Sequence, residues 1–198
     1  MKNIDQGGTT RVVIDPGEYY VTNKAEIIST LLGSCVAACL YDPVSRVIGM
    51  NHFLLAYQSQ TLRPQLESEE GRYGLYAMEL LINSMMKLGA VKSRLQAKCF
   101  GGGNVLLINT RGGKTQTVGD VNVEFIKAFL NKENIPIVAS DLGGNAGRNI
   151  HFVAEDFAVY VKPITMNLTQ HIAQEERRYW KKNIELQEQE KQSKVDYW

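Results

Sequence analysis

One short segment, residues 29–42 with the sequence STLLGSCVAACLYD, constrains the fold of this chain most strongly. Its first apolar run ends in the small-residue pair Gly33-Ser34, and a second apolar run begins at Cys35. Small residues between two apolar runs are typical of a tight turn. The second run fits either a strand or a short buried helix, because periodicity does not separate the two at this length. The segment therefore predicts a cysteine that directly follows a turn.

A histidine, His52, closes the next strand-like segment, so its side chain and that of Cys35 can meet across neighbouring strands. An adjacent imidazole is the usual means of converting a cysteine thiol into the nucleophilic thiolate. Hydroxyl groups at Ser29 and Thr30 can bind the far nitrogen of the imidazole and fix its tautomer, as the third member of a catalytic triad does. The residues alone leave a second interpretation open, because a small buried cysteine is often inert core.

The length, the composition and the net charge of the sequence exclude several classes of protein. A length of 198 residues with 44% hydrophobic residues suits one domain with a core of normal size and room for an appendage. The net charge of +1 gives no electrostatic case for binding nucleic acid, and no apolar run is long enough for membrane insertion. The three cysteines contain no CxxC pair, which argues against a disulfide framework and a structural metal. Without a signal-peptide pattern, the sequence predicts a reduced, cytoplasmic protein.

The chain carries both strand and helix patterns. Residues 1–10 are polar and are expected to be loose. Apolar runs between turn signals predict strands at residues 11–14, 18–21, 25–32, 94–100, 105–109, 135–139 and 151–161. Apolar residues at helical spacing predict helices at 72–88 and 118–131, the first of them followed by Gly89 as its C-terminal cap.

Two glycine-rich segments interrupt this pattern. The first, FGGGN at residues 100–104, matches neither GxGxxG nor the P-loop pattern, so it predicts a tight turn or a close backbone approach. The second, residues 141–148, contains Asn145 and Arg148. These two side chains either shape a substrate entrance or form a turn and a local ion pair, and we leave both outside the catalytic set.

The remaining cysteines and histidines form no second motif. Cys39 follows Cys35 at a spacing that differs from the redox CxxC motif, and Cys99 lies in an expected strand, so both are predicted to be packed core residues. His151 and His171 lie in no pattern of metal ligands.

The composition changes after residue 163. Residues 171–194 are charged and rich in glutamine, with acidic and basic residues interleaved, which predicts an exposed helix with ion pairs or a partly disordered segment. The expected anchors of this stretch, Tyr179, Trp180 and Ile184, would dock weakly or serve a partner. We therefore divide the chain into a domain at residues 11–163 and a C-terminal extension at residues 164–198.

Three motifs carry a resemblance to a known family. GEYYV at residues 17–21, LLGSCVAACLYDP at 31–43 and GMNHFLL at 49–55 resemble the CheD family, the chemoreceptor glutamine deamidases of bacterial chemotaxis. The helix expected at 72–88 and the two glycine-rich segments fall where that family has its helix and its glycine-rich loops. The resemblance covers roughly residues 13–162.

The resemblance implies a fold and a set of site residues. The implied fold is α+β, a layered β-sheet sandwich with helices packed outside, similar to the catalytic domain of bacterial toxins that deamidate glutamine. Cys35 matches the family's nucleophile and His52, seventeen residues on, matches its histidine. The family's third member is a threonine six residues before the cysteine, a position that Ser29 occupies here, with Thr30 beside it. We therefore expect Ser29 to orient His52.

The function implied by the resemblance is deamidation of specific glutamine side chains of methyl-accepting chemoreceptors, with release of ammonia through a thioester on Cys35. The backbone amides of residues 33–35 are natural candidates to hold the oxyanion. The resemblance implies no metal and no organic cofactor. The implied partners are the cytoplasmic helices of chemoreceptors and, in some bacteria, a CheC-type phosphatase.

Two other classes of function stay open beside the enzyme. A module that binds chemoreceptors or a chemotaxis adaptor without turnover is favoured by the serine at position 29 and by the charged tail, whereas the intact pair of Cys35 and His52 favours the enzyme. A cysteine protease would use the same nucleophile, but the sequence has no protease-family signature. A thiol-redox role would require Cys39 or Cys99 to form a disulfide with Cys35.

Overall fold

The structure is a computed structural model of the 198-residue chain. It describes residues 1–6, 8–55, 69–105, 117–165, 168–169, 171–179, 181–182 and 185. The strand expected at 105–109 and the expected anchors Trp180 and Ile184 lie outside the described residues, apart from residue 105.

Among the described residues, ten strands form two five-stranded sheets. The first sheet has the order β1-β2-β4-β9-β10 and the second the order β3-β6-β5-β7-β8. The strands of the first sheet are β1 (Lys2–Gln6), β2 (Thr9–Val13), β4 (Glu26–Leu32), β9 (Arg148–Val153) and β10 (Val159–Pro163). The strands of the second sheet are β3 (Tyr19–Thr22), β5 (Val36–Asp42), β6 (Val47–Phe53), β7 (Gln96–Gly101) and β8 (Ile137–Leu142).

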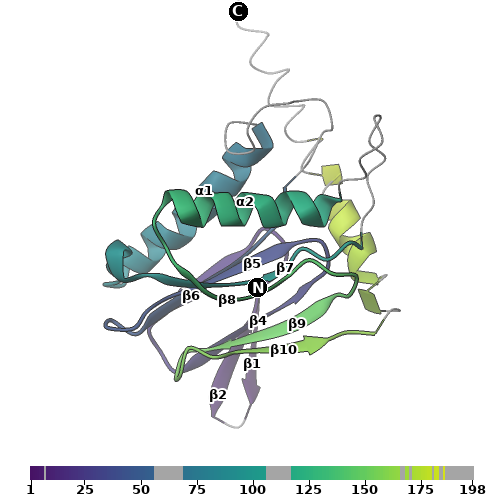
Figure 1. Cartoon of the computed structure of the whole chain (residues 1–198). Helices are drawn as coiled ribbons and strands as arrows, with labels where there is room; N and C mark the ends of the chain where they lie inside the picture. The colour runs from purple at the N-terminus through teal and green to yellow at the C-terminus, as the bar shows by residue number, and fades with distance from the viewer. Residues whose placement is uncertain are drawn as a thin grey trace, which may run out of the picture.

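Two long helices cover the outer face of the second sheet, and the first sheet lies against its other face (Figure 1). Helix α1 (Glu69–Lys87) contacts β3 and β6, and helix α2 (Val118–Lys132) contacts β5 and β7. A short 3₁₀ helix, η2 (Lys92–Arg94), precedes β7. The result is a β-sheet sandwich with helices outside, which confirms the expected α+β class.

Strand β5 is buried on both faces, and its alternating residues belong to two separate cores. Val36, Ala38 and Leu40 pack with the helices, whereas Cys35 and the alternate residues that follow it pack between the two sheets. A strand covered on both faces carries apolar residues at every position, so it loses the period-2 pattern of a half-exposed strand. That is the reason why periodicity left this segment open between strand and helix.

The N-terminal ten residues differ from their expected loose conformation. Strand β1 pairs antiparallel with β2, and Lys2 lies opposite Val13 in the register. Backbone groups at the edge of a sheet pair with another strand whatever its side chains are, so a polar segment can extend the sheet. The expectation was wrong because it judged the segment by its side chains alone.

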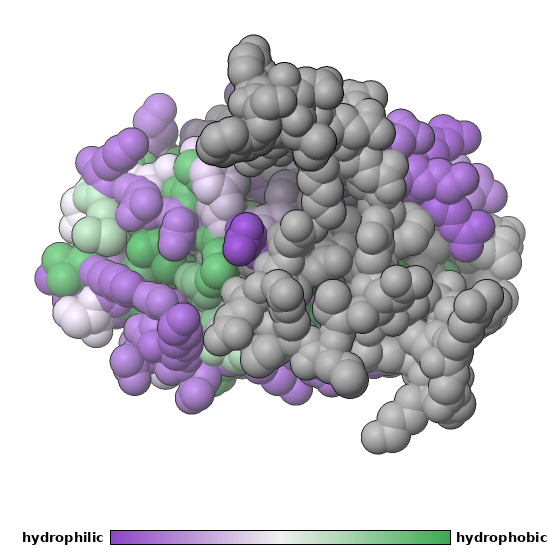
Figure 2. Space-filling view, turned by 90° about the horizontal axis from the view of Figure 1, so that it is seen from above, coloured by the Kyte–Doolittle hydropathy of each residue, from purple (hydrophilic) through white to green (hydrophobic). Residues whose placement is uncertain are grey.

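The two predicted helices are present with small differences in their bounds: α1 begins three residues before and ends one residue before its predicted range of 72–88, and α2 ends one residue after its predicted range of 118–131. Thr117 and Asp120 form a reciprocal capping box at the start of α2. Gly89, after α1, has a φ of +98°, the left-handed conformation that glycine adopts at least cost. Among the described residues, no helix combines the length and the apolar character that a membrane span requires. Seen from above, the described part of the helix-covered side carries hydrophilic and hydrophobic side chains interspersed (Figure 2).

Candidate active site

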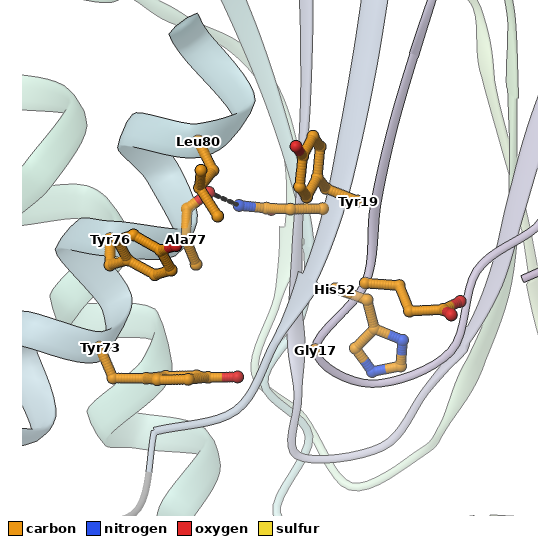
Figure 3. A pocket seen from close by; sticks show the side chains of 9 residues that line it. Gly17, Tyr19, His52, Tyr73, Tyr76, Ala77 and Leu80 are labelled. Carbon is orange, nitrogen blue, oxygen red and sulfur yellow. Dashed lines mark hydrogen bonds between the residues drawn. The ribbon is translucent and has the colours of Figure 1, made fainter. Parts of the chain in front are cut away.

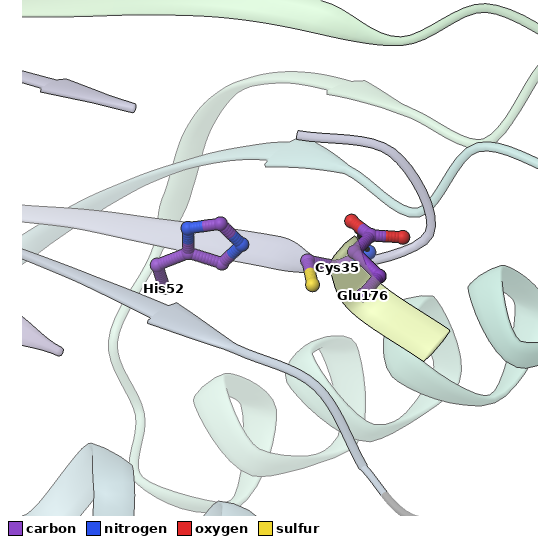
Figure 4. A group of neighbouring side chains, drawn as sticks. All are labelled: Cys35, His52 and Glu176. Carbon is purple, nitrogen blue, oxygen red and sulfur yellow. Dashed lines mark hydrogen bonds between the residues drawn. The ribbon is translucent and has the colours of Figure 1, made fainter. Parts of the chain in front are cut away.

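The structure brings Cys35 and His52 together at one end of the core between the sheets. Ala37 pairs directly with His52 in the β5–β6 register, and Cys35 lies two residues earlier on the same face. Residues related in this diagonal way are within reach of each other's side chains. The Cys35 sulfur, a ring nitrogen of His52 and a carboxylate oxygen of Glu176 all lie within 4.8 Å of one another. Figure 4 shows the Cys35 side chain between the imidazole and the carboxylate.

The hydroxyl that binds His52 belongs to Thr30, which corrects the expectation for Ser29. Thr30 Oγ1 lies 2.8 Å from His52 Nδ1, whereas Ser29 Oγ lies 2.7 Å from Nδ1 of His151. Successive side chains of a strand point to opposite faces. On β4, Thr30 therefore faces the inter-sheet core together with His52, and Ser29 faces away from it toward its β9 neighbour His151.

The hydrogen bonds of Thr30 fix the tautomer of His52. The Thr30 hydroxyl donates its hydrogen to the carbonyl oxygen of Ile14 at 2.7 Å, so toward His52 it can only accept. Nδ1 of His52 therefore carries the hydrogen, and Nε2 carries the free lone pair. Nε2 is buried without a hydrogen-bond partner among the described residues. In Figure 4 this nitrogen faces Cys35, as a proton acceptor for the thiol must.

Burial keeps both members of the pair neutral in this conformation. Desolvation lowers the pKa of His52 to about 4, although the negative charge of Glu176 opposes the shift. Desolvation raises the pKa of the Cys35 thiol well above its usual value, and the charge of Glu176 and a hydrogen bond to it raise it further. Near neutral pH the pair is thus a thiol beside a neutral imidazole, and the thiolate is not yet formed.

Four hydrogen-bond donors at the turn before β5 converge on the Glu176 carboxylate. The backbone N–H groups of Gly33 and Cys35 donate to Oε1 at 2.9 and 3.1 Å. The backbone N–H and the hydroxyl of Ser34 donate to Oε2 at 2.8 and 2.6 Å. We call these donors the amide cradle. Preorganised N–H groups of this kind stabilise negative charge on oxygen, as an oxyanion hole does.

The orientation of the amide cradle is set by its carbonyl groups. In a planar trans peptide the N–H points opposite to the preceding C=O. The Gly33 carbonyl accepts from the N–H of Gly103 at 2.7 Å, and the Ser34 carbonyl accepts from the Asn122 side chain at 2.8 Å. These two bonds turn the N–H groups of Ser34 and Cys35 toward the carboxylate. Asn122, fully buried on α2, is a positioning residue that sequence reasoning missed.

The FGGGN segment is a close backbone approach to the same turn, as its sequence predicted. The N–H of Gly102 donates to the Cys35 carbonyl at 2.7 Å. Gly101 has a φ of +104°, and a Cβ at this position would overlap the Cys35 carbonyl oxygen. A side chain at Gly101 would therefore push the loop away from the turn that carries Cys35.

The second glycine-rich segment is joined to the first by Arg148. Its guanidinium donates to the Asp141 carboxylate at 2.8 and 3.0 Å and to the carbonyls of Gly101 and Gly143 at 3.1 and 2.6 Å. Of the two roles considered for Arg148, the structure shows the local ion pair. Asn145 is exposed. The arginine acts on the site by holding loops in place.

A pocket of about 70 Å³ lies between α1 and the strands β3 and β6, and His52 is one of its lining residues. Figure 3 shows Tyr73 and Tyr76 projecting from α1 toward these strands. The Tyr73 hydroxyl forms a hydrogen bond with the Tyr179 hydroxyl, so the C-terminal extension reaches the rim of this region. Burial, with that bond and the nearby Cys35 as lesser causes, raises the pKa of Tyr73.

The cluster of Cys35, His52 and Glu176 consists of residue types that bind zinc. Both Glu176 oxygens, however, accept hydrogen bonds from the amide cradle. N–H groups that converge on one point favour a negative or carbonyl oxygen there and repel a cation. The described part of the site therefore fits an acyl group better than a metal ion.

The other two cysteines are buried and free. Burial raises the pKa of the Cys99 thiol to about 12 and that of Cys39 well above its usual value. A thiol in such surroundings is inert, which agrees with the predicted core packing of both residues.

Glu176 was also missed by sequence reasoning. It belongs to a helical segment, residues 171–179, in a tail whose charged composition predicted exposure. The one local signal is the spacing of Ile172, Glu176 and Tyr179, which places the three on one face of a helix. A glutamate between two apolar residues on that face gives little reason to expect burial.

Comparison with known proteins places the chain in a family. The family model described as CheD chemotactic sensory transduction matches residues 54–163. The probable chemoreceptor glutamine deamidase CheD 1 of Geobacter sulfurreducens is 45% identical to this chain, over 93% of this chain and 92% of the relative's own length. That alignment therefore extends into the C-terminal extension. The probable chemoreceptor glutamine deamidase CheD 2 of Shewanella oneidensis is 50% identical over 81% of this chain and 80% of its own length.

Among solved structures, Bacillus licheniformis hypothetical protein YfiH is similar over 62% of this chain and 49% of its own length, at 13% identity and a TM-score of 0.39. That likeness is too low to carry an argument. The family model covers more than half of the chain, and the two relatives extend the match over most of the rest. The chain belongs to the CheD family.

Proposed function

We propose that this protein is a chemoreceptor glutamine deamidase, a protein-glutamine glutaminase that converts receptor glutamine to glutamate with release of ammonia. The names of the relatives support this function. The observation that carries it is the Glu176 carboxylate, which fills the amide cradle within 4.8 Å of Cys35 and His52. A glutamate side chain is also the product of the proposed reaction, so the binding of Glu176 in the amide cradle supports this proposal.

The first half-reaction forms a thioester. His52 Nε2 takes the proton of the Cys35 thiol, and the sulfur attacks the carboxamide carbon of the substrate. The carbonyl oxygen becomes an oxyanion in the position of Glu176 Oε1, where Gly33 and Cys35 donate. Protonated His52 then gives its proton to the nitrogen, the C–N bond breaks and ammonia leaves. One oxyanion donor contributes about 3–4 kcal/mol to such a step.

The second half-reaction restores the enzyme. His52, neutral again, takes a proton from a water molecule that attacks the thioester carbon. The C–S bond breaks as protonated His52 gives its proton to the sulfur, and the carboxylic acid formed releases its own proton to solvent, so that a glutamate carboxylate remains in the amide cradle. Because Thr30 holds the hydrogen on Nδ1, Nε2 performs all of these proton transfers.

The proposed substrates place the protein in the cytoplasm, where the methylated helices of chemoreceptors lie. A CheC-type phosphatase is a further proposed partner, on the basis of the family resemblance alone.

The alternative is a module that binds chemoreceptors without turnover. The unprotonated Nε2 directed at Cys35 favours the enzyme, because a binding surface has no use for an oriented proton acceptor beside a buried thiol. A protease would use the same groups but would leave a cleaved chain.

The test is intact-mass analysis of a chemoreceptor cytoplasmic fragment incubated with the wild-type protein and with Cys35→Ala. We expect a gain of about one mass unit per site with the wild type only, because covalent catalysis replaces NH₂ by OH. Binding of the fragment to both proteins without any mass change would establish the binding module instead. Fragmentation of the receptor would establish a protease.

A further inference from the structure

The C-terminal helical segment, residues 171–179, lies over the catalytic pair. Its inward face buries Ile172 and Glu176 and half-buries Tyr179, whereas the neighbouring Glu175 and Arg177 are exposed. Figure 1 shows this segment, in yellow-green, beside one end of α2. One side of the segment therefore packs on the domain, and Glu176 is at the centre of that side.

The domain has room for this segment at two glycines. A Cβ at Gly33 would lie 2.9 Å from the Glu176 carboxylate, and a Cβ at Gly17 would overlap the Tyr179 hydroxyl. Tyr179 also bonds to Tyr73 of α1. Contacts to the turn before β5, the turn before β3 and α1 hold the segment on three sides, which distinguishes it from a tail that rests on a surface.

Glu176 occupies the position of the reacting group. Its side chain is 0% exposed, and so is that of Cys35 beneath it. A substrate glutamine needs the same amide cradle and the same approach to Cys35, so substrate and Glu176 exclude each other.

We propose that residues 171–179 are an intramolecular product mimic, which holds Glu176 in the active site and must leave before a receptor glutamine can enter. This inference rests on the proposed function of the site. The product mimic also indicates how a receptor glutamine can reach the active site, because the Glu176 side chain extends into the site from a segment that is itself helical. A receptor glutamine can enter in the same way without local unfolding of its helix.

The amide cradle favours a carboxylate over a carboxamide. All four of its groups donate to Glu176, so an amide NH₂ in the place of Oε2 would meet the N–H of Ser34. Glu176→Gln should therefore loosen the segment. The carboxamide of that variant still reaches Cys35, and its carbonyl oxygen can accept from Gly33 and Cys35.

The product mimic also keeps the nucleophile inactive. The negative charge of Glu176 and its hydrogen bond to the thiol add to burial in raising the pKa of Cys35. Departure of the segment removes these causes together and exposes the sulfur. Departure of the segment therefore ends the exclusion of substrate and lowers the pKa of the thiol in one movement.

The first experiment is peptide mass mapping of Glu176→Gln, with Glu175→Gln as a matched control. Glu175 is the adjacent residue on the same segment, but its side chain is exposed and forms an ion pair with His171. We expect residue 176 to convert to glutamate with a gain of about one mass unit, while residue 175 stays glutamine. The double variant Cys35→Ala/Glu176→Gln should keep its glutamine. Conversion that persists without Cys35 would overturn the self-deamidation.

The second experiment measures alkylation of Cys35 by iodoacetamide in the wild type, Glu176→Ala and Glu175→Ala. A closed state occupied about 90% of the time slows a reaction about tenfold, so Glu176→Ala should react at least about tenfold faster than the other two. The same three proteins are then assayed on the receptor fragment, where Glu176→Ala should be fastest.

These measurements separate the inference from the proposed function. Receptor deamidation at equal rates in all three proteins, with equal alkylation, would overturn the product mimic and leave the deamidase intact. Faster alkylation of Glu176→Ala without receptor deamidation by any of the proteins would overturn the deamidase and leave the closing segment.

Discussion

Two hydroxyl–imidazole pairs lie on opposite faces of strand β4, one residue apart. Thr30 binds His52 Nδ1 at 2.8 Å on the inner face, and Ser29 binds His151 Nδ1 at 2.7 Å on the other. The two hydrogen bonds are alike in length and in the atoms that they join. They differ in surroundings, because within the described part of the chain the inner pair alone has a cysteine and an amide cradle within reach.

The difference teaches that a hydroxyl–imidazole bond is not a catalytic feature by itself. Thr30 has given its hydrogen to Ile14, so it forces the tautomer of His52. Burial lowers the pKa of both histidines, but His52 is almost fully enclosed while His151 is partly exposed. Orientation, enclosure and a nearby nucleophile together distinguish the inner pair.

The largest expected effect separates the two histidines. His52→Ala should lower kcat/KM for receptor deamidation by about 10²–10⁴-fold, the usual contribution of a general acid–base residue. The matched variant His151→Ala should stay close to the wild type. Both are measured by ammonia release from a receptor fragment. Equal losses would mean that the outer pair takes part in the chemistry.

A smaller effect separates the two hydroxyls. Thr30→Val removes a hydrogen bond of about 1 kcal/mol, so we expect a five- to tenfold lower kcat. Thr30→Ser keeps the hydroxyl and should recover most of the rate, and Ser29→Ala should change it little. A merely structural role of Thr30 would leave the pH profile of kcat unchanged, whereas loss of the fixed tautomer should shift it. A larger loss in Ser29→Ala than in Thr30→Val would restore the original expectation for Ser29.

A further difference concerns the pH dependence of stability. His52 has a folded pKa of about 4, below its unfolded value of about 6.5, so between these values the unfolded state binds more protons. Stability should therefore fall as the pH decreases from 6.5 to 4. His52→Asn should flatten this slope more than His151→Asn, because His52 is the more deeply buried. Urea midpoints at several pH values measure the slope, and identical slopes in the two variants would contradict the stated burial effect.

Much of the site could be predicted from the sequence. The Gly-Ser turn before Cys35 predicted the proposed nucleophile and the amides proposed to hold the oxyanion, and the next strand supplied His52. These residues lie close together in the chain, on neighbouring strands joined by a short connection. Local sequence patterns were therefore sufficient to predict that Cys35 and His52 lie together. The resemblance to the CheD family added the function that the two residues are expected to perform.

Three features depended on the tertiary structure. The choice between Ser29 and Thr30 depended on which face of β4 meets the other sheet, and a shift of one residue reverses that face. Asn122 supports the turn from a helix far along the chain. Glu176 lies more than 140 residues after the amides that bind it, in a tail with the composition of an exposed helix. The sequence alone determined the chemistry that Cys35 and His52 can perform. The tertiary structure decided which hydroxyl orients the histidine and which carboxylate fills the site, because both depend on contacts between segments that local patterns do not connect.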